Sequence, residues 1–552
     1  MSFRAPISDQ RLTLNAVVGI GDLENGPDAE MVDAVLEGAA ALAEGEFAPL
    51  LRTGDTIGSR WDNGVVTTPP GFKEAWNAFV EGGWMTLAAP EHVGGQGLPF
   101  VLSAALMDNL NAANVGFALC PMLSMGAIEA LERHGSEDLK RDYLPKIVSG
   151  EWPATMNLTE PAAGSDVGAL KTRAEPVGDG SWKIKGTKIF ITYGDHDLSE
   201  QILHLVLART SGAPEGTRGI SLFLVPKVLP DGTQNDLRCV SIEHKLGIHA
   251  SPTCVMSYGD HDGAIGWLVG PEMGGMAAMF TMMNNARLNV GLQGVGIAER
   301  ATQRAVAYAM ERKQGHRNRL PVPIAEHPDV RRMLLRMRAL TMGARALVYY
   351  AFGQVDRAAR ADPGAGLRAE VLTPLAKAWA TDVGIEVANL GIQVHGGMGY
   401  IEETGAAQHL RDARIASIYE GTNGIQAADL VGRKLGLDGG LAFDGLIADI
   451  EAETQDLRLI ALTDAVEVAA ATLRGAAPDD RLAGSYPFLI MTSVMVAGWL
   501  VERMAHSPEA DERAKAAADF FLATIVPEAL GLGAAAEAGA ALLYSVPAEA
   551  LA

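Results

Sequence analysis

The chain has 552 residues, of which 48% are hydrophobic, so it can bury a large core divided among several domains. Its formal net charge of -22 repels phosphate backbones and anionic lipid, so neither nucleic acid nor a membrane surface is an expected partner. Three scattered cysteines, Cys120, Cys239 and Cys254, are too few for a disulfide framework or a zinc cluster. Together with an amino terminus that lacks a secretory apolar stretch, they predict a cytoplasmic protein with a small-molecule partner.

The order of elements predicts an α+β multidomain fold. Helical spacing over 31–51 and 102–150 predicts an N-terminal helical domain, residues 1–155. Short β-branched runs separated by Gly, Pro and Asp, at 181–192, 202–208 and 219–225, predict a middle β-barrel-like or sandwich domain over 156–272. From Gly274 to Asp362 the helical pattern returns without further strand signals, which predicts a C-terminal helical bundle over 273–438. Alanine-rich runs then predict an appended helical domain, residues 439–552.

One apolar stretch raises the question of a membrane span. Residues 486–501 (YPFLIMTSVMVAGWLV) are almost continuously apolar. The run is shorter than the roughly 20 residues needed to cross a bilayer, so we interpret it as a buried helix.

The middle domain opens with a loop that suits a polar ligand. In MNLTEPAAGSDVGALKT, residues 156–172, hydroxyl groups and bare glycine backbone can receive a ring edge or a diphosphate, although a loop capped by Ser and Asp explains the same pattern. No G-x-G-x-x-G follows a strand, and the nearest match, residues 531–536, lies in a helical run, which argues against a Rossmann site. His92, His395 and His409 lack metal-ligand spacing, so no metal is expected.

A glutamate stands at the edge of an apolar run in RIASIYEGTNGIQ, residues 414–426. Glu420 follows Ile418 and Tyr419 directly and precedes a Gly-Thr-Asn-Gly turn. A glutamate at an exposed helix end is the simplest interpretation of this position alone. If Ile418 and Tyr419 desolvate the carboxylate instead, its pKa rises towards the range of a general base.

Six motifs, in this order, carry a family resemblance. They are MNLTEPAAGSD, KIFITYGDHD, NNARLNVGLQGVGIAERA, AYAMERKQG, IQVHGGMGY and RIASIYEGTNG. Together they resemble the acyl-CoA dehydrogenase family from about Gly82 to Leu435, and the appended segment resembles that of its larger members. The resemblance implies an FAD enzyme that desaturates an acyl-CoA thioester at Cα–Cβ.

The resemblance also implies an FAD site shared between subunits of a homodimer. One group of residues would line the flavin ring: Met156, Leu158, Thr159, Phe190 and Thr192, with Phe190 where the family commonly has tryptophan. A second group would reach the adenosine diphosphate part, some of it across the subunit interface: Arg312, Gln314, Gln393, Gly397, Thr422 and Gly424, with Gly424 where glutamine is often found. A glycine-rich turn allows such close packing, and a guanidinium suits a diphosphate.

The implied substrate contacts centre on the glutamate. Ser165, Asn284 and Arg287 would bind the CoA portion, although Asn284 and Arg287 also fit a solvated helix face. Gly421 would leave room for the thioester, and Glu420 would remove the α proton while a hydride leaves the β carbon for flavin N5. In the family, a backbone N–H and a flavin hydroxyl meet the charge on the thioester oxygen.

Substrate and electron acceptor stay open at this level. The resemblance favours a short or medium acyl group, for example 3-methylmercaptopropionyl-CoA, and an electron-transferring flavoprotein as acceptor. An acyl-CoA oxidase that uses oxygen is one alternative. A DNA-binding relative of these enzymes is another, but the segment after Gly439 has no basic cluster to neutralise phosphates.

Overall fold

The computed structural model describes residues 3–552, which form two compact units. The barrel unit comprises residues 41–99 and 113–286. The helical unit comprises the chain up to Ala40, residues 100–112 and residues 287–552. The predicted fold class is confirmed: helices, a β domain, a helical bundle and appended helices follow one another. The bounds of the four predicted domains stay a prediction, because each of the two compact units combines separate stretches of the chain and does not test them.

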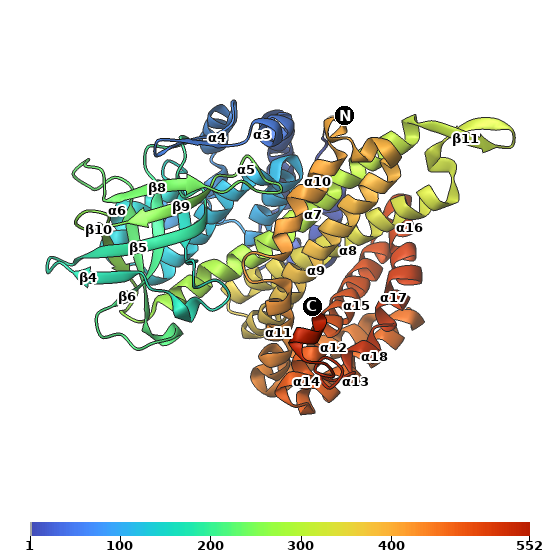
Figure 1. Cartoon of the computed structure of the whole chain (residues 1–552). Helices are drawn as coiled ribbons and strands as arrows, with labels where there is room; N and C mark the ends of the chain where they lie inside the picture. Colours follow the sequence, from blue (N-terminus) through green and yellow to red (C-terminus); the bar gives the residue numbers. More distant parts are fainter. Residues whose placement is uncertain (1–2) are drawn as a thin grey trace. The chain divides into compact units, whose positions relative to one another are not determined.

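An eight-stranded sheet closes on itself in the barrel unit (Figure 1). The strand order is β10-β7-β6-β4-β5-β9-β8, β3 adds to β6, and β5 also pairs with β10. The core inside it is built from β-branched and aromatic side chains such as Ile184, Val206 and Phe223, as the sequence runs predicted. The strands are β3 Ala154–Asn157, β4 Arg173–Pro176, β5 Ser181–Thr192, β6 Leu203–Thr210, β7 Ile220–Pro226, β8 Leu237–Ile242, β9 Thr253–Tyr258 and β10 Ala264–Val269.

Helices of the same unit pack around a cluster of aromatic rings. Phe47 stacks on Phe117 with ring centroids 4.5 Å apart, and Phe72 lies 4.4 Å from Phe117. The long helix α5 (Phe100–His134) has a break in its helical geometry at Asn114, next to the boundary between the units. The other elements are α3 Leu51–Ile57, β1 Arg60–Asp62, β2 Val65–Thr67, α4 Phe72–Glu81, α6 Glu137–Val148 and the start of α7 Gly275–Glu311.

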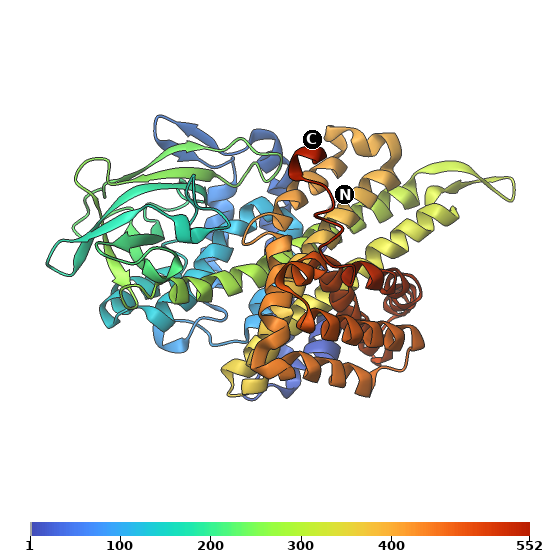
Figure 2. The same cartoon turned by 60° about the horizontal axis from the view of Figure 1, so that its bottom comes forward.

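The helical unit is a bundle with further helices packed on it. In Figures 1 and 2 the appended helices gather beside α8 and α9. The bundle elements are α1 Ile7–Thr13, α2 Ala29–Leu42 (its last residues in the barrel unit), the rest of α7, α8 Pro328–Ala359, α9 Pro363–His395, α10 Ala406–Ala413 and α11 Asn423–Gly432. The appended helices are α12 Leu441–Glu453, α13 Leu457–Gly475, α14 Pro478–Ala483, α15 Ser485–His506, α16 Glu512–Phe520, α17 Val526–Leu530 and α18 Gly533–Ala536.

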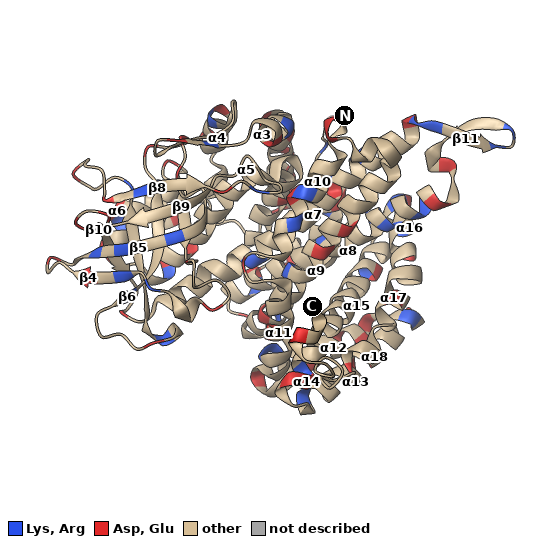
Figure 3. Ribbon diagram, viewed as in Figure 1, with Lys and Arg blue, Asp and Glu red and all other residues tan. Residues whose placement is uncertain are grey.

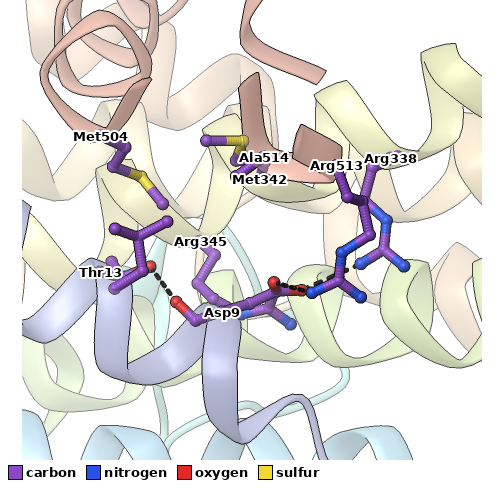
Figure 4. Close-up of a pocket in the computed structure, with 9 residues that line it drawn as sticks. Asp9, Thr13, Arg338, Met342, Arg345, Met504, Arg513 and Ala514 are labelled. Carbon is purple, nitrogen blue, oxygen red and sulfur yellow. Dashed lines mark hydrogen bonds and ion pairs between the residues drawn. The ribbon is translucent and has the colours of Figure 1, made fainter. Parts of the chain in front are cut away.

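Ion pairs join the appended helices to the bundle (Figure 4). Arg513, from α16, lies 2.7 Å from Asp9 of α1, and Arg338 of α8 lies 2.9 Å from the same carboxylate. Inside the bundle, Arg345 bridges the buried carboxylates of Asp108, at 2.8 Å, and Glu299, at 3.1 Å. Lys, Arg, Asp and Glu are interspersed along the appended helices (Figure 3), so their surface lacks the single-sign stripe that phosphate binding favours.

Three segments of the described chain are long and apolar enough to cross a membrane, by length and composition alone. They are α5, α15 and the stretch Glu512–Ala536, and their most apolar windows are 89%, 83% and 39% buried in the protein. The predicted buried helix at 486–501 is confirmed as part of α15. The helix is longer than the apolar run, however: polar residues extend it to 22 residues, so its length does not exclude a membrane span, contrary to the sequence-based expectation.

Two hairpins were missed by the sequence prediction. One is β1–β2; the other is formed by β11 (Lys313–Arg317) and β12 (Leu320–Pro323), and it projects from the ends of α7 and α8 in Figures 1 and 2. The absence of strands between Gly274 and Asp362 was therefore wrongly predicted. The β11–β12 side chains are mostly exposed, so no alternating apolar pattern marks them, and Asn318 and Arg319 form the turn with positive φ.

Candidate functional site

Glu420 lies in a strained turn between two helical segments. It follows the 3-10 turn Arg414–Ser417 and precedes α11, and its φ is +55°, in the left-handed region that side-chain-bearing residues rarely adopt. Gly421 follows with φ +85°. Strain of this kind persists only where the surroundings hold it in place, and it is often found at functional sites.

Packing around Glu420 differs from the sequence-based expectation. Tyr419 points inward and its hydroxyl donates a hydrogen bond to the side-chain oxygen of Gln293 on α7. Ile418, however, is 47% exposed, so it does not bury the carboxylate in this chain. Of the two neighbours expected to desolvate Glu420, only Tyr419 is turned inward.

Burial and two cations set the protonation of Glu420. Burial raises the pKa of the Glu420 carboxyl, in the predicted direction, while the charges of Arg287 and Lys377 oppose the rise. Arg287, 7% exposed, donates from Nε to the backbone oxygen of Glu420 at 3.4 Å. A carboxyl with a raised pKa, held beside cations that keep it ionised, is suited to accept a proton near neutral pH.

Lys377 was missed by the sequence analysis. It lies on α9 with its side chain fully buried, and burial lowers its pKa to about 7 against the charges of Glu420 and Asp382. A lysine inside the apolar run LTPLAKAWA, residues 372–380, is the signal that could have drawn attention to it, because lysine is almost never fully buried without a partner.

The loop predicted to line the flavin is pinned to strand β5. Met156 lies in strand β3, directly before the loop. In the loop, the carbonyl oxygen of Leu158 accepts a hydrogen bond from Lys188 Nζ at 3.0 Å, and that of Thr159 accepts one from Ile189 N at 2.9 Å. The barrel unit thus brings Met156, Leu158 and Thr159 next to β5, the strand that carries Phe190 and Thr192.

Phe190 of β5 presents an exposed aromatic ring beside this loop. It is 57% exposed, its φ is +60°, and the β5–β9 register shifts between Lys188 and Ile191, so the aromatic ring stands out on a bulge. Bulges re-aim side chains, and an exposed aromatic face beside hydrogen-bonding threonines, Thr159 and Thr192, fits a flat polar ring system such as a flavin.

The residues predicted for the diphosphate lie near one end of two helices of the bundle. Tyr308 of α7 stacks on His395 of α9 with ring centroids 4.4 Å apart. Arg312 and Gln314, whose side chains lie 3.4 Å apart, follow the end of α7; Gln393 and Gly397 are exposed on either side of His395. All four stand on surface that a partner or a cofactor can reach.

Other predicted residues are more scattered. Thr422 caps α11, where its hydroxyl oxygen accepts from Ile425 N at 3.1 Å, and Gly424 is exposed in the first turn. Asn284 is exposed, unlike Arg287, so the two residues of α7 do not share one environment. Ser165 is exposed in the barrel unit. No group of histidine, cysteine and carboxylate side chains among residues 3–552 could hold a metal ion.

Comparison with known proteins gives one family along nearly the whole chain. The N-terminal, middle and C-terminal domains of acyl-CoA dehydrogenase match residues 31–151, 155–260 and 273–435. A domain described as "Acetyl-CoA dehydrogenase C-terminal like" matches residues 446–547.

Individual relatives agree with this assignment. The 3-methylmercaptopropionyl-CoA dehydrogenase of Ruegeria pomeroyi is 47% identical, over 95% of this chain and 94% of its own. A chain in the structure of an electron transferring flavoprotein of Acidaminococcus fermentans is 28% identical with a TM-score of 0.64, and covers 75% of this chain and 100% of its own. An acyl-CoA dehydrogenase from Bacillus anthracis complexed with FAD has the same fold, with a TM-score of 0.77 at 22% identity, over 100% of this chain and 94% of its own. The chain belongs to the acyl-CoA dehydrogenase family, whose members are FAD-dependent oxidoreductases.

Proposed function

We propose that Glu420 is the base that removes the α proton of an acyl-CoA thioester. The product of the reaction is the trans-2-enoyl-CoA. The observation that carries the proposal is the environment of its carboxyl, whose pKa is raised by burial while Arg287 and Lys377 oppose the rise. FAD, when bound, would supply the acceptor for the β hydride. Together with the proton accepted by Glu420, this would account for both hydrogens lost by the substrate.

The turn around Glu420 requires glycine at position 421. A Cβ placed on Gly421 would lie 2.8 Å from Gln426 Nε2 and 3.8 Å from Arg287 Nη2, so a larger residue would force the turn to shift. In the proposal, Met156, Leu158, Thr159, Phe190 and Thr192 hold the flavin ring. The diphosphate is held by the second predicted group: Arg312, Gln314, Gln393, Gly397, Thr422 and Gly424.

Substitution of Glu420 by Gln tests this role. Glutamine keeps the size of the side chain but cannot accept the proton, so Glu420→Gln is expected to retain bound flavin and its visible spectrum. It should fail to bleach when an acyl-CoA is added without oxygen. Bleaching at the wild-type rate would exclude Glu420 as the base.

For the substrate, we propose a short or medium acyl-CoA, with 3-methylmercaptopropionyl-CoA as the first candidate. The support is the relative from Ruegeria pomeroyi, which carries that name and matches along nearly the whole chain. The test is the rate of anaerobic flavin bleaching across acyl-CoAs of increasing length, with and without the methylthio group. A clear preference for long chains would overturn the proposal.

As electron acceptor we propose an electron-transferring flavoprotein. The similarity to a chain found in the structure of such a protein from Acidaminococcus fermentans supports the choice. Turnover with that class of protein should be rapid, and peroxide should not accumulate in air. Stoichiometric peroxide with each enoyl-CoA would favour the oxidase alternative.

The remaining part of the proposal is a homodimer with shared FAD sites. Around Gly397, three apolar side chains are exposed, Met398, Tyr400 and Ile401, with Tyr400 86% exposed. An apolar patch beside cofactor-binding positions is typical of a surface covered by another subunit. Tyr400→Asp is expected to weaken both the dimer, by light scattering, and flavin retention; an FAD-loaded monomer would contradict shared sites.

A further inference from the structure

A side chain of the appended helices reaches the polar surroundings of Glu420. Helix α15 packs against both α9, which carries Lys377, and α11, which follows the base (Figure 1). Tyr486, in the first turn of α15, donates a hydrogen bond from its hydroxyl to Asp382 Oδ2 of α9, at 2.5 Å. A residue of the appended segment is thus bonded directly to a carboxylate of the catalytic bundle.

Asp382 also bonds to Asn423, in the segment that follows the base. Its second carboxylate oxygen, Oδ1, accepts from Asn423 Nδ2 at 2.9 Å, and the same amide nitrogen lies 3.0 Å from the backbone oxygen of Ala378 and from Thr381 Oγ1. Asn423 is the third residue after Glu420 and is buried. Because every polar atom of its side chain is engaged, the orientation of Asn423 is fixed.

The last link is the buried lysine. Asn423 Oδ1 accepts from Lys377 Nζ at 2.9 Å. The charge of Lys377 acts in turn on the Glu420 carboxyl, and the carboxylates of Glu420 and Asp382 both favour the charged form of the lysine. A series of hydrogen bonds therefore runs from Tyr486 through Asp382 and Asn423 to Lys377, and the charge of Lys377 acts on the base.

We propose that Lys377 positions and keeps ionised the Glu420 carboxylate, and that Tyr486 of the appended segment supports it through Asp382 and Asn423. This inference rests on the proposed role of Glu420 as the base. It gives the appended helices a part in catalysis in addition to packing.

The charged and titratable groups around the base come from four elements. They are Arg287 on α7, Lys377 and Asp382 on α9, Tyr419 before the turn, and, through their effect on Arg287, Asp429 on α11 and Arg433 directly after it. Arg414 and Tyr486 act on Asp382. Hydrogen bonds from Tyr486 through Asp382 and Asn423 connect Lys377 to the appended helices. Removal of the lysine charge must raise the pKa of Glu420. Loss of the hydrogen bond from Tyr486 must disfavour the ionised form of Asp382, and a less negative Asp382 in turn favours the charged form of Lys377 less.

The pH dependence of flavin bleaching tests the series. The FAD-loaded enzyme is mixed with saturating acyl-CoA without oxygen, and the bleaching rate is measured across pH. Lys377→Met, which keeps a long side chain, should raise the midpoint of the profile by about 1 pH unit or more, as expected for loss of a nearby opposite charge. Tyr486→Phe, which removes only the hydroxyl, should raise it by a smaller amount.

A matched control separates chemistry from docking. Glu528 of α17 also binds the bundle, through Arg336 at 2.8 Å, but it has no link to Glu420. Glu528→Gln should leave the midpoint at the wild-type value, whatever its effect on the melting temperature. Lys377→Arg, if it restores the wild-type midpoint, adds support that the charge is what matters.

The outcomes distinguish this inference from the proposed function. If Glu420→Gln bleaches normally, Glu420 is not the base, and the inference about Lys377 and Tyr486 fails with it. If Glu420→Gln is inactive but Lys377→Met and Tyr486→Phe keep the wild-type midpoint, the base stands and the series is overturned. A shift in Glu528→Gln as large as in Tyr486→Phe would also overturn it, because docking alone would then explain the effect.

Discussion

The ammonium group of Lys188 lies 2.8 Å from the carboxylate of Glu160, and both side chains are buried. Glu160 also accepts hydrogen bonds from the backbone of Lys171 and Thr172, while Lys188 donates to the backbone oxygen of Leu158. One ion pair therefore holds both ends of the loop that is expected to border the flavin. Burial lowers the pKa of Lys188 to about 8, although Glu160 favours its charged form.

Lys188→Met should impair both the fold of the barrel unit and its hold on the flavin. The substitution leaves Glu160 buried without its partner, a change that typically costs about 3–5 kcal/mol of unfolding free energy. We expect a lower melting temperature and a reduced ratio of bound flavin to protein. Lys183→Met is the matched control on the same strand: its partner Asp262 is largely exposed, so loss of this ion pair should have little effect on stability. Equal losses in both variants would contradict a special role for Lys188.

Gly421→Ala should slow bleaching while the flavin stays bound. The residue has φ +85°, and a Cβ there would lie 2.8 Å from Gln426 Nε2, so the turn that carries Glu420 must shift. Small displacements of a reacting group can cost about 100-fold in rate. Gly432→Ala, near the end of α11 with open space around its Cα, is the control and should bleach at the wild-type rate.

Of the barrel strands, β5, β6 and β7 were predictable, because they are runs of apolar and β-branched residues with turn residues at their ends. β5 has the predicted bounds, 181–192, and β6 and β7 begin within one residue of prediction. The β1–β2 hairpin was missed although Asn63 and Gly64, both with positive φ, form the Asn-Gly turn that often marks a hairpin. A local signal was present there and was overlooked.

The surroundings of the base were not predictable in the same way. Glu420 was found from its motif, but Lys377 lies 43 residues earlier and Tyr486 66 residues later, and only the packing of α9, α11 and α15 brings them to it. Periodicity describes each helix separately and says nothing about which helices meet. For the same reason the exposure of Ile418 could not be read from its apolar neighbours.

Stability of the barrel unit should fall as the pH drops below about 6.5, partly because of His204. Burial, with Lys227 and His196 adding to it, lowers the pKa of His204 from its usual 6.5 to about 3. The folded state therefore resists a proton that the unfolded chain accepts, so stability is complete above the unfolded pKa and is lost as the pH falls. Between about pH 7 and about pH 5.5 the loss is about 1.3 kcal/mol for one such histidine.

His204→Gln should remove that share of the pH dependence. Glutamine can still bond to Thr155, which lies 2.8 Å from His204 Nδ1, but it does not titrate. Thermal unfolding of both proteins at the two pH values measures the difference, with the exposed His244→Gln as control. A variant with the full wild-type pH dependence would show that other groups cause it.

Arg345→Met should destabilise the helical unit more than any change in the ion pairs on its surface. Arg345 is buried between Asp108 and Glu299, and burial would raise the pKa of Glu299, but Arg338 and Arg345 together lower it to about 2. Without the guanidinium, two buried carboxylates lose their shared partner, at a cost of about 3–5 kcal/mol. Arg513→Ala removes an exposed partner of Asp9 and should cost less than about 1 kcal/mol. Melting temperatures of the two variants measure this contrast. A larger loss in Arg513→Ala would mean that the docking of α16, rather than the buried cluster, limits the stability of the unit.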